Sequence, residues 1–364
     1  MSGGYRKHLK TLLSQLTSSD DIECVFCASP EKLYVSKWIK PTEKIQYEHC
    51  KPYKLFSKRD VELHRQLDRF KPDVIFVPLE RYFKHRDIPT VCMVRNMLPL
   101  IDFKHVNVLE TVRNKVQKIL AIIAVRKSQR IITLSCFVSE YLQNEWKIPS
   151  QKIALVHHGT DLNCRIKLSV PQNISPESSG RYFFTAGSIE RYRGFEDIIF
   201  AVNRLKKEGT SHIVLVAGSA RRAMKSYADK LQRMVSQMGL EENIHWLGNL
   251  NDNEMAWCYR NCKAFIMTSR VESFGQTALE AMSHECICIS TRNPCLPEVF
   301  GDAAIYYNAG NEVELSEQIK HVLLWDVFQK REMSQRALRR AAQFTVSDVV
   351  SKTVKELKKA FESS

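Results

Sequence analysis

Short apolar runs alternate with longer amphipathic stretches over the whole chain. The longer stretches repeat apolar residues every three or four positions, which is typical of helices, and the short runs are typical of buried strands. Because the two alternate, the sequence predicts two α/β units with mostly parallel sheets. The strands are expected near Glu23–Cys27, Val74–Val77, Thr90–Val94, Arg130–Thr133, Ile153–His157, Tyr182–Ala186, His212–Ala217, Ile244–Leu247, Ala264–Met267, Cys286–Ser290 and Ala304–Tyr307. The helices of the first unit are expected at Tyr5–Leu16, Lys58–Phe70, Val108–Lys127 and Ser135–Trp146.

A stretch without periodicity separates the two units. Ser169–Gly180 is rich in proline, serine and glycine, as linkers are. A chain of 364 residues with 44% hydrophobic residues is long enough for two cores. We therefore expect a first domain over residues 1–168, a linker over 169–180, a second domain over 181–345 and a final helix over 346–364.

The cysteines and the apolar runs indicate the compartment. Eleven cysteines are an odd number, and Cys92, Cys286 and Cys288 lie inside apolar strands, which favours reduced core thiols in a cytosolic protein. Cys24 and Cys27 have a metal or redox spacing but no second pair, so we expect core packing and no metal site. The polar start does not resemble a signal peptide, and the longest apolar run, Ile119–Val125, is too short to span a bilayer. We expect a cytoplasmic protein.

The positive charge is concentrated in the first half. Residues 1–150 hold 26 Lys and Arg against 16 Asp and Glu, and the remaining residues hold 28 against 24. The densest part is the stretch over 108–130, which contains the predicted amphipathic helix Val108–Lys127. It either packs on its own sheet with a solvated basic face, or contacts an anionic membrane surface, and the two interpretations are compatible. No recognition motif accompanies the charge, so nucleic acid is not an expected partner.

The segment Arg270–Met282 carries the strongest chemical signal. Glu272 and Glu280 flank a glycine turn that joins a predicted strand to a helix over 276–283. In a doubly wound sheet this end of a strand binds ligands, and free amides at a helix start favour a phosphate. Glu280 lies about one turn into the helix, where its carboxylate can accept hydrogen bonds from hydroxyls. The pattern indicates a sugar nucleotide as the ligand.

Further segments extend this pattern in both directions. They are Ala186-Gly187-Ser188-Ile189-Glu190, Val216-Ala217-Gly218, Ile244-His245-Trp246-Leu247-Gly248, Leu296-Pro297-Glu298-Val299 and Gly301-Asp302-Ala303-Ala304. In this order they resemble the donor half of the GT-B glycosyltransferases of family 4, also called group 1. The resemblance covers residues 130–364 well and residues 3–130 more loosely. It implies two Rossmann-like domains facing a cleft, with acceptor binding on the first, nucleotide-sugar binding on the second, and a final helix that crosses back to the first.

The resemblance also assigns the donor site. It implies that Glu280 binds the ribose hydroxyls and that Glu272 contacts the hydroxyls of the donor sugar. The amides of Phe274, Gly275 and Gln276 would lie near sugar and phosphate.

The loop over 187–194 departs from the family pattern. The family places an arginine and a lysine here to neutralise the departing diphosphate. When no metal ion takes part, cationic side chains or backbone amides must stabilise that negative charge. Arg193 aligns with the lysine. Ser188 or Tyr192 stands where the arginine is expected, and Arg191 is a candidate substitute. Gly187 and Gly218, which follow two successive strands, complete this part of the expected donor site.

The beginning of the chain is unusual for this family. Gly3 and Gly4 match a glycine turn whose backbone approaches the donor diphosphate, but the strand that precedes this turn in the family is absent. That strand is central in a doubly wound sheet. Either the chain is truncated or begins at a wrong start, or another segment fills the gap; we expect the first.

The acceptor side matches less well. Arg95 and Asn96 replace the His-Asp pair that many relatives have ahead of a proline. A guanidinium cannot act as a base, so Arg95 either binds or stabilises charge, or is a surface loop residue. His157–Asp161 matches a Gly-x-Asp segment that we interpret as mainly structural.

Together these patterns predict a retaining, metal-independent glycosyltransferase. It would move a hexose from a UDP- or GDP-linked donor to a saccharide or lipid-linked acceptor in polysaccharide biosynthesis, with Glu272, Arg193 and Arg95 at the reaction centre and no cofactor. A peripheral position at the inner face of a membrane is the second interpretation of its location. The alternative function is a non-catalytic GT-B module that binds nucleotide or a partner protein. A phosphorylase or hydrolase is disfavoured, because no paired acid and nucleophile is evident.

Overall fold

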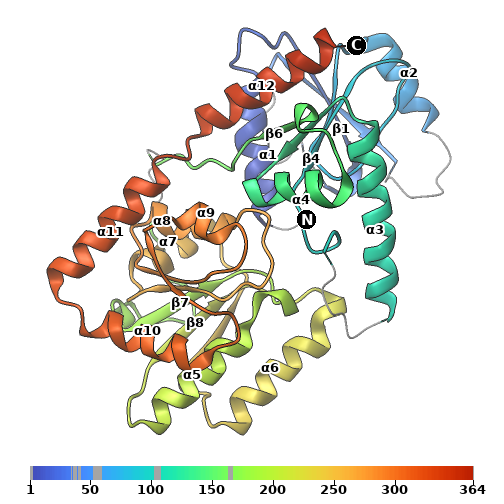
Figure 1. The fold of residues 1–364 in the computed structure, drawn as a ribbon. Helices are drawn as coiled ribbons and strands as arrows, with labels where there is room; N and C mark the ends of the chain where they lie inside the picture. The colour runs from blue at the N-terminus through green and yellow to red at the C-terminus, as the bar shows by residue number, and fades with distance from the viewer. Residues whose placement is uncertain are drawn as a thin grey trace. The chain divides into compact units, whose positions relative to one another are not determined.

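The computed structural model describes residues 3–33, 35, 39, 42–51, 60–101, 108–162 and 167–363. The chain divides into two compact units (Figure 1). The first unit comprises Met1–Gly159 with Val346–Ser364, and the second comprises Thr160–Thr345. Each is described by itself below.

A parallel four-stranded sheet forms the centre of the first unit, in the order β3-β4-β5-β6. Its strands are β3 (Ile75–Val77), β4 (Thr90–Val94), β5 (Arg130–Thr133) and β6 (Ile153–Leu155). Helix α1 (Gly3–Leu16) precedes the strands of this unit, and α2 (Val61–Phe70), α3 (Val108–Lys127) and α4 (Cys136–Trp146) lie between them along the chain. Side chains of Asp60 and Ser135 accept hydrogen bonds from backbone amides at the starts of α2 and α4, which fixes where these helices begin.

Two further strands form a separate parallel pair. β1 (Val25–Pro30) runs beside β2 (Ile45–Cys50), and no strand in the described ranges joins this pair to the four-stranded sheet. Gly3 and Gly4 lie in the first turn of α1. The expectation that they form a turn ahead of the helix is therefore wrong for this structure. A helix tolerates each glycine at a cost of about 1 kcal/mol relative to alanine, so the periodic sequence after them extends the helix backward.

The final helix, α12 (Val346–Glu362), belongs to the first unit. It packs against α1 and against strands β4 and β5. Glu356 on its buried face forms an ion pair with Arg130 at the start of β5, and both side chains are largely buried. An amphipathic helix with a buried ion pair therefore ties the end of the chain to the first sheet.

The second unit is a doubly wound sheet of six parallel strands in the order β12-β11-β10-β7-β8-β9. The strands are β7 (Tyr182–Ala186), β8 (Ile213–Ala217), β9 (Ile244–Gly248), β10 (Phe265–Met267), β11 (Cys288–Thr291) and β12 (Ala304–Tyr307). The helices are α5 (Phe195–Lys207), α6 (Lys225–Gln237), α7 (Asp252–Arg260), α8 (Gln276–Ser283), α9 (Leu296–Phe300), α10 (Glu312–Leu324) and α11 (Val327–Ala341). The strand order reverses between β7 and β10. In such a sheet, ligands bind at the carboxyl ends of the strands beside this reversal.

The expected linker packs onto the second unit. The amide of Ser169 donates to the carbonyl of Asn253, and the amide of Gly180 donates to the carbonyl of Asn261. The compact units divide ahead of this segment, between Gly159 and Thr160.

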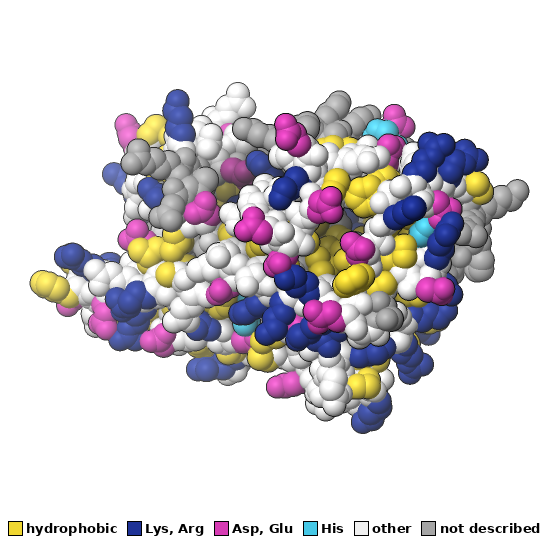
Figure 2. Space-filling model, turned by 90° about the horizontal axis from the view of Figure 1, so that it is seen from above, with side chains coloured by type: hydrophobic (Ala, Val, Ile, Leu, Met, Phe, Trp, Pro, Cys, Tyr) yellow, Lys and Arg dark blue, Asp and Glu magenta, His cyan; other side chains and the backbone are white. Residues whose placement is uncertain are grey.

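The surface is charged but mixed. On the face drawn in Figure 2, Lys and Arg side chains are spread widely, with Asp and Glu side chains among them. Within the described residues, no helix is both long enough and apolar enough to cross a membrane.

Candidate donor site

An ion pair lies at the point where the strand order reverses in the second unit. Arg193, in the loop after β7, places Nη1 2.6 Å from Oε1 of Glu272, in the loop after β10. Ser269 donates to the same carboxylate oxygen at 2.9 Å, and Arg193 Nη1 lies 3.3 Å from Ser269 Oγ. The relative exposure of the two charged side chains is only 15% and 11%. Two predicted catalytic residues therefore meet in the same place.

The charge of Arg193 is maintained despite its burial. Burial opposes the cation, but the neighbouring Glu272 and Tyr192 raise the pKa of the guanidinium above its ordinary value. Its Nε–H is buried and has no hydrogen-bond partner among the described residues. A buried donor without a partner costs free energy, so this group favours an incoming acceptor atom such as a phosphate oxygen.

Glycine is required where these loops approach each other. Gly218, after β8, has a φ of 132°, and a Cβ there would lie 1.9 Å from the carbonyl oxygen of Gly187. Gly275 has a φ of 96° and directly precedes α8. Gly187 and Gly218 thus let two loop backbones pack closely at one end of the sheet, and Gly275 lets the chain take the positive φ from which α8 starts.

Glu280 is held on α8 by a separate partner. Tyr259, at the end of α7, donates its hydroxyl to Oε2 of Glu280 at 3.3 Å. Burial, and then Glu280 itself, raise the pKa of Tyr259, so the phenol keeps the proton it donates. Phe274, at the turn before α8, is buried and contacts the ring of Phe344 edge to face. Gln276 begins the helix, as predicted, so its amide and that of Gly275 lie at the helix start.

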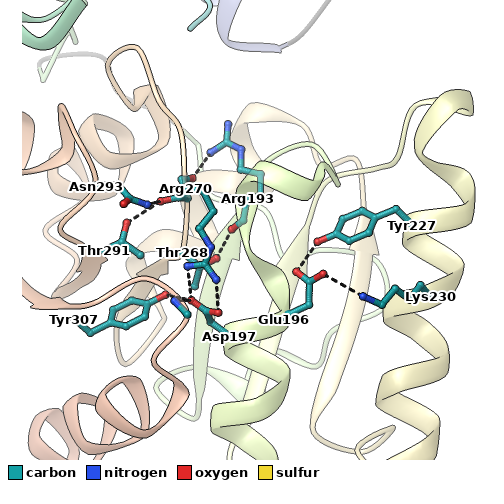
Figure 3. Close-up of polar contacts among 12 residues, drawn as sticks. Arg193, Glu196, Asp197, Tyr227, Lys230, Thr268, Arg270, Thr291, Asn293 and Tyr307 are labelled. Carbon is teal, nitrogen blue, oxygen red and sulfur yellow. Dashed lines mark hydrogen bonds and ion pairs between the residues drawn. The ribbon is translucent and has the colours of Figure 1, made fainter. Parts of the chain in front are cut away.

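A buried carboxylate on α5 connects the segments that follow β10 and β12 (Figure 3). Asp197, on α5, accepts hydrogen bonds from Arg270, from the hydroxyl of Tyr307 at 2.9 Å and from the amide of Gly310 at 3.0 Å. Thr268 donates to the carbonyl of Arg193 and so joins the β7 and β10 loops directly. Sequence reasoning missed this network. The feature that could have revealed it is Asp197, a carboxylate among the apolar residues of the buried face of α5.

The other residues predicted in the β7 loop have different surroundings. Arg191 places its guanidinium over the ring of Tyr227, 4.9 Å from the centroid. Glu190 is buried and forms a two-point ion pair with Arg221, in the loop after β8. Ser188 is half-buried beside them. The cation that the structure places against Glu272 is therefore Arg193, whereas Arg191 packs on α6.

The predicted acceptor-side residues lie in the first unit. The amides of Arg95 and Asn96 both donate to Oε1 of Glu80, which fixes the loop after β4. His8, on α1, has its Nδ1 3.1 Å from Nδ1 of His158. Burial and the charge of Arg95 lower the pKa of His8 to about 4. Arg95 is thus close to two neutral histidines that sequence reasoning did not group with it.

The fold and the site define a class, a GT-B glycosyltransferase. The fold matches a Rickettsia africae glycosyltransferase at a TM-score of 0.72 and 14% identity, covering 100% of this chain and 96% of that one. It matches Anabaena Alr3699/HepE in complex with UDP and glucose at a TM-score of 0.73 and 15% identity, covering 98% and 96%. The predicted fold class is confirmed.

Sequence comparison identifies the family. The profile described as "Glycosyl transferases group 1" matches residues 170–342, and that described as "Glycosyltransferase Family 4" matches residues 2–163. The chain therefore belongs to the group 1, family 4 glycosyltransferases, as its motifs predict. Curated relatives include the O-antigen chain mannosyltransferase RfbU of Salmonella typhimurium, 23% identical over 55% of this chain, and the serotype-specific mannosyltransferase WbdA of Escherichia coli, 21% identical over 92%. The chain matches 52% and 42% of the lengths of these two relatives.

Proposed function

We propose that this protein is a retaining, metal-independent hexosyltransferase that uses a nucleotide-diphosphate sugar. The observation that carries the proposal is the buried ion pair Arg193–Glu272, which lies where the strand order reverses. Glu272 is in the loop just before α8, the helix that carries Glu280. A cation, a helix start and two carboxylates meet the needs of a ligand with two phosphates and several hydroxyls.

The proposed roles follow from the chemistry of each group. Arg193 and the amides at the start of α8 stabilise the negative charge that grows on the diphosphate as the sugar leaves. Glu280 accepts hydrogen bonds from the ribose, and Glu272 accepts them from the sugar. Because these groups supply the charge stabilisation, the reaction proceeds without a metal ion.

Retention is proposed from the family, and the surroundings of Glu272 argue against a covalent intermediate on that carboxylate. Its carboxylate is already engaged by a guanidinium and a hydroxyl, which makes it a weak nucleophile. The acceptor then attacks from the face that the diphosphate leaves, and a phosphate oxygen takes the proton of the acceptor.

The donor sugar and the acceptor are proposed from the relatives. RfbU and WbdA are named mannosyltransferases, and the HepE structures contain UDP with glucose. We therefore propose transfer of mannose or another hexose to a saccharide or lipid-linked saccharide acceptor.

Calorimetry tests the donor site. UDP, GDP and ADP are titrated into the wild-type chain, the E280A variant and the E285Q variant, whose altered carboxylate lies beyond the far end of the same helix. We expect one nucleotide to bind, E280A to weaken it at least about tenfold and E285Q to change it less than about twofold. Equal binding to E280A and wild type would place the nucleotide elsewhere.

The outer face of α3 supports a membrane contact for the first unit. Val112, Ile119 and Ile123 are 53%, 57% and 39% exposed, while Ala121 and Val125 are buried on the opposite side. Lys115, Arg126 and Lys127 are exposed on the same helix. We propose that this face meets an anionic membrane that holds a lipid-linked acceptor. Replacing these three cations with glutamine should weaken binding to anionic vesicles; unchanged binding would reject this contact.

A non-catalytic nucleotide-binding module is the alternative. The observation that favours it is the loop after β4, where a guanidinium, which cannot act as a base, lies close enough to His8 and His158 for its charge to lower the pKa of both. This alternative requires nucleotide binding without sugar transfer. Release of nucleotide from a bound donor sugar, with transfer to an added saccharide, would exclude it.

A further inference from the structure

An exposed apolar elbow joins α10 to α11 in the second unit. We call residues Leu324–Phe328 the elbow. Leu324, Val327 and Phe328 are 84%, 77% and 83% exposed, the highest values among the exposed large hydrophobic residues described. Hydrophobic side chains project at the left margin of Figure 2, in the region where Figure 1 draws the connection between α10 and α11.

The chain holds the elbow in one shape. Trp325 packs on the hydrophobic core of the unit and contacts His321 edge to face, with ring centroids 5.4 Å apart. Asp326 caps α11 through a reciprocal pair of hydrogen bonds with Gln329. Trp325 packs inward, Asp326 caps α11, and the helix starts at Val327. The side chains of Val327 and Phe328 in its first turn are therefore exposed to solvent.

Two cations, Lys330 and Arg331, follow the elbow on α11. Arg331 is exposed, and neither Arg331 nor Lys330 has an ion pair among the described residues. Lys330 lies close enough to Lys263 to help burial lower the pKa of that amine, so two like charges share this surface. The single acid within the elbow, Asp326, has its carboxylate engaged at the helix start.

The size and shape of the elbow favour lipid over protein. A stable protein interface buries about 800 Å² on each partner, whereas even a large aromatic side chain contributes only about 150–250 Å². Three projecting side chains fall well short of that area. Apolar side chains that protrude beside lysine and arginine are suited to the boundary between acyl chains and anionic headgroups.

We propose that the elbow inserts Leu324, Val327 and Phe328 into the surface of an anionic membrane, with Lys330 and Arg331 at the headgroups. This contact is independent of the proposed contact through α3 and of the donor chemistry. It gives the second unit its own membrane attachment, close to a surface on which a lipid-linked acceptor is presented.

Co-sedimentation with large vesicles tests the proposal. The full chain is mixed with vesicles of phosphatidylcholine and phosphatidylglycerol, or of phosphatidylcholine alone. We expect the double variant L324S/F328S to lower the partition coefficient on anionic vesicles at least about tenfold. The matched control V313S, at the opposite end of α10 and 42% exposed, should change it less than about twofold.

A second double variant separates the contribution of the positive charges from that of the inserted apolar side chains. The double variant K330Q/R331Q should lower binding to anionic vesicles at least about fivefold and leave binding to phosphatidylcholine unchanged. The variant with the three glutamine substitutions on α3 is measured in parallel. It distinguishes vesicle binding that is lost at the first unit from vesicle binding that is lost at the elbow. The proposal would be overturned if L324S/F328S bound anionic vesicles within about twofold of the wild type. It would also be overturned if the wild type did not bind anionic vesicles at all. A loss of self-association in L324S/F328S, measured by sedimentation velocity, would assign the elbow to a second copy of the chain and also overturn it.

Discussion

The two units support their predicted site residues in different ways. In the second unit, Asp197, Arg270, Thr268, Glu272 and Arg193 form connected ion pairs and hydrogen bonds across two loops. In the first unit, the loop that carries Arg95 and Asn96 is held through its backbone, because both amides donate to Glu80, and the neighbouring strand β3 is half-buried. The comparison indicates that side-chain ion pairs and hydrogen bonds preorganise the proposed donor site in the second unit.

Removing the central carboxylate should have the largest effect. D197A leaves the Arg270 guanidinium and the Tyr307 hydroxyl without their buried acceptor. We expect the free energy of unfolding of the second unit to fall by about 3–5 kcal/mol, measured by urea denaturation. The control D60A, which removes the cap of α2 and the exposed acceptor of the Lys51 amide in the first unit, should cost about 1–2 kcal/mol. Equal losses in the two variants would remove the contrast between the units.

Removing the cation of the proposed donor site should abolish most transfer. R193A deletes the charge that we propose to face the departing diphosphate, so kcat for sugar transfer should fall about 10²–10³-fold. R191A, whose guanidinium packs on Tyr227, should retain activity within about tenfold. If the two variants lose activity equally, Arg193 has no special place in the reaction.

The histidine pair of the first unit makes stability depend on pH. His8 has a pKa of about 4 in the folded protein and 6.5 as its ordinary value, so the unfolded chain takes up the proton first as pH falls. Stability is therefore complete above pH 6.5 and is lost between about pH 6.5 and 4, by about 3 kcal/mol. H8N should flatten this dependence in urea titrations at several pH values. An unchanged slope would show that His8 titrates normally.

The smallest effect is expected at the partner of Glu280. Y259F removes one hydrogen bond to that carboxylate, with a predicted weakening of nucleotide binding of about threefold to tenfold. Calorimetry beside the wild type measures it. A loss as large as that of E280A would assign a direct contact with the ligand to Tyr259.

The fold followed from the sequence where apolar runs were continuous. β4, β5, β7 and β12 begin and end at the predicted residues, because each is a buried run between polar turns. β2, Ile45–Cys50, was missed, since it places polar side chains between and after Ile45 and Tyr47 and has no apolar run. The two glycines at the start were predicted as a turn by analogy, but the periodic sequence that follows extends α1 over them despite the low helix propensity of glycine.

The candidate site was predictable only in part. Arg193 and Glu272 were found because both lie in short motifs next to strands. The support from Asp197 joins α5 to residues 73 and 110 positions away, so only the assembled sheet brings them together. Likewise, the contact between Arg191 and Tyr227 depends on how α6 packs, which no local pattern shows.

The most direct test of the donor site is hydrogen–deuterium exchange with and without the nucleotide that binds. Peptides that cover residues 187–194 and 268–280 should exchange more slowly when nucleotide is present, because their amides and Arg193 would face the diphosphate. Peptides of the first sheet over 90–94 and 130–133 should not change. Protection that appears only in other parts of the chain would contradict the assignment of the donor site to the reversal between β7 and β10.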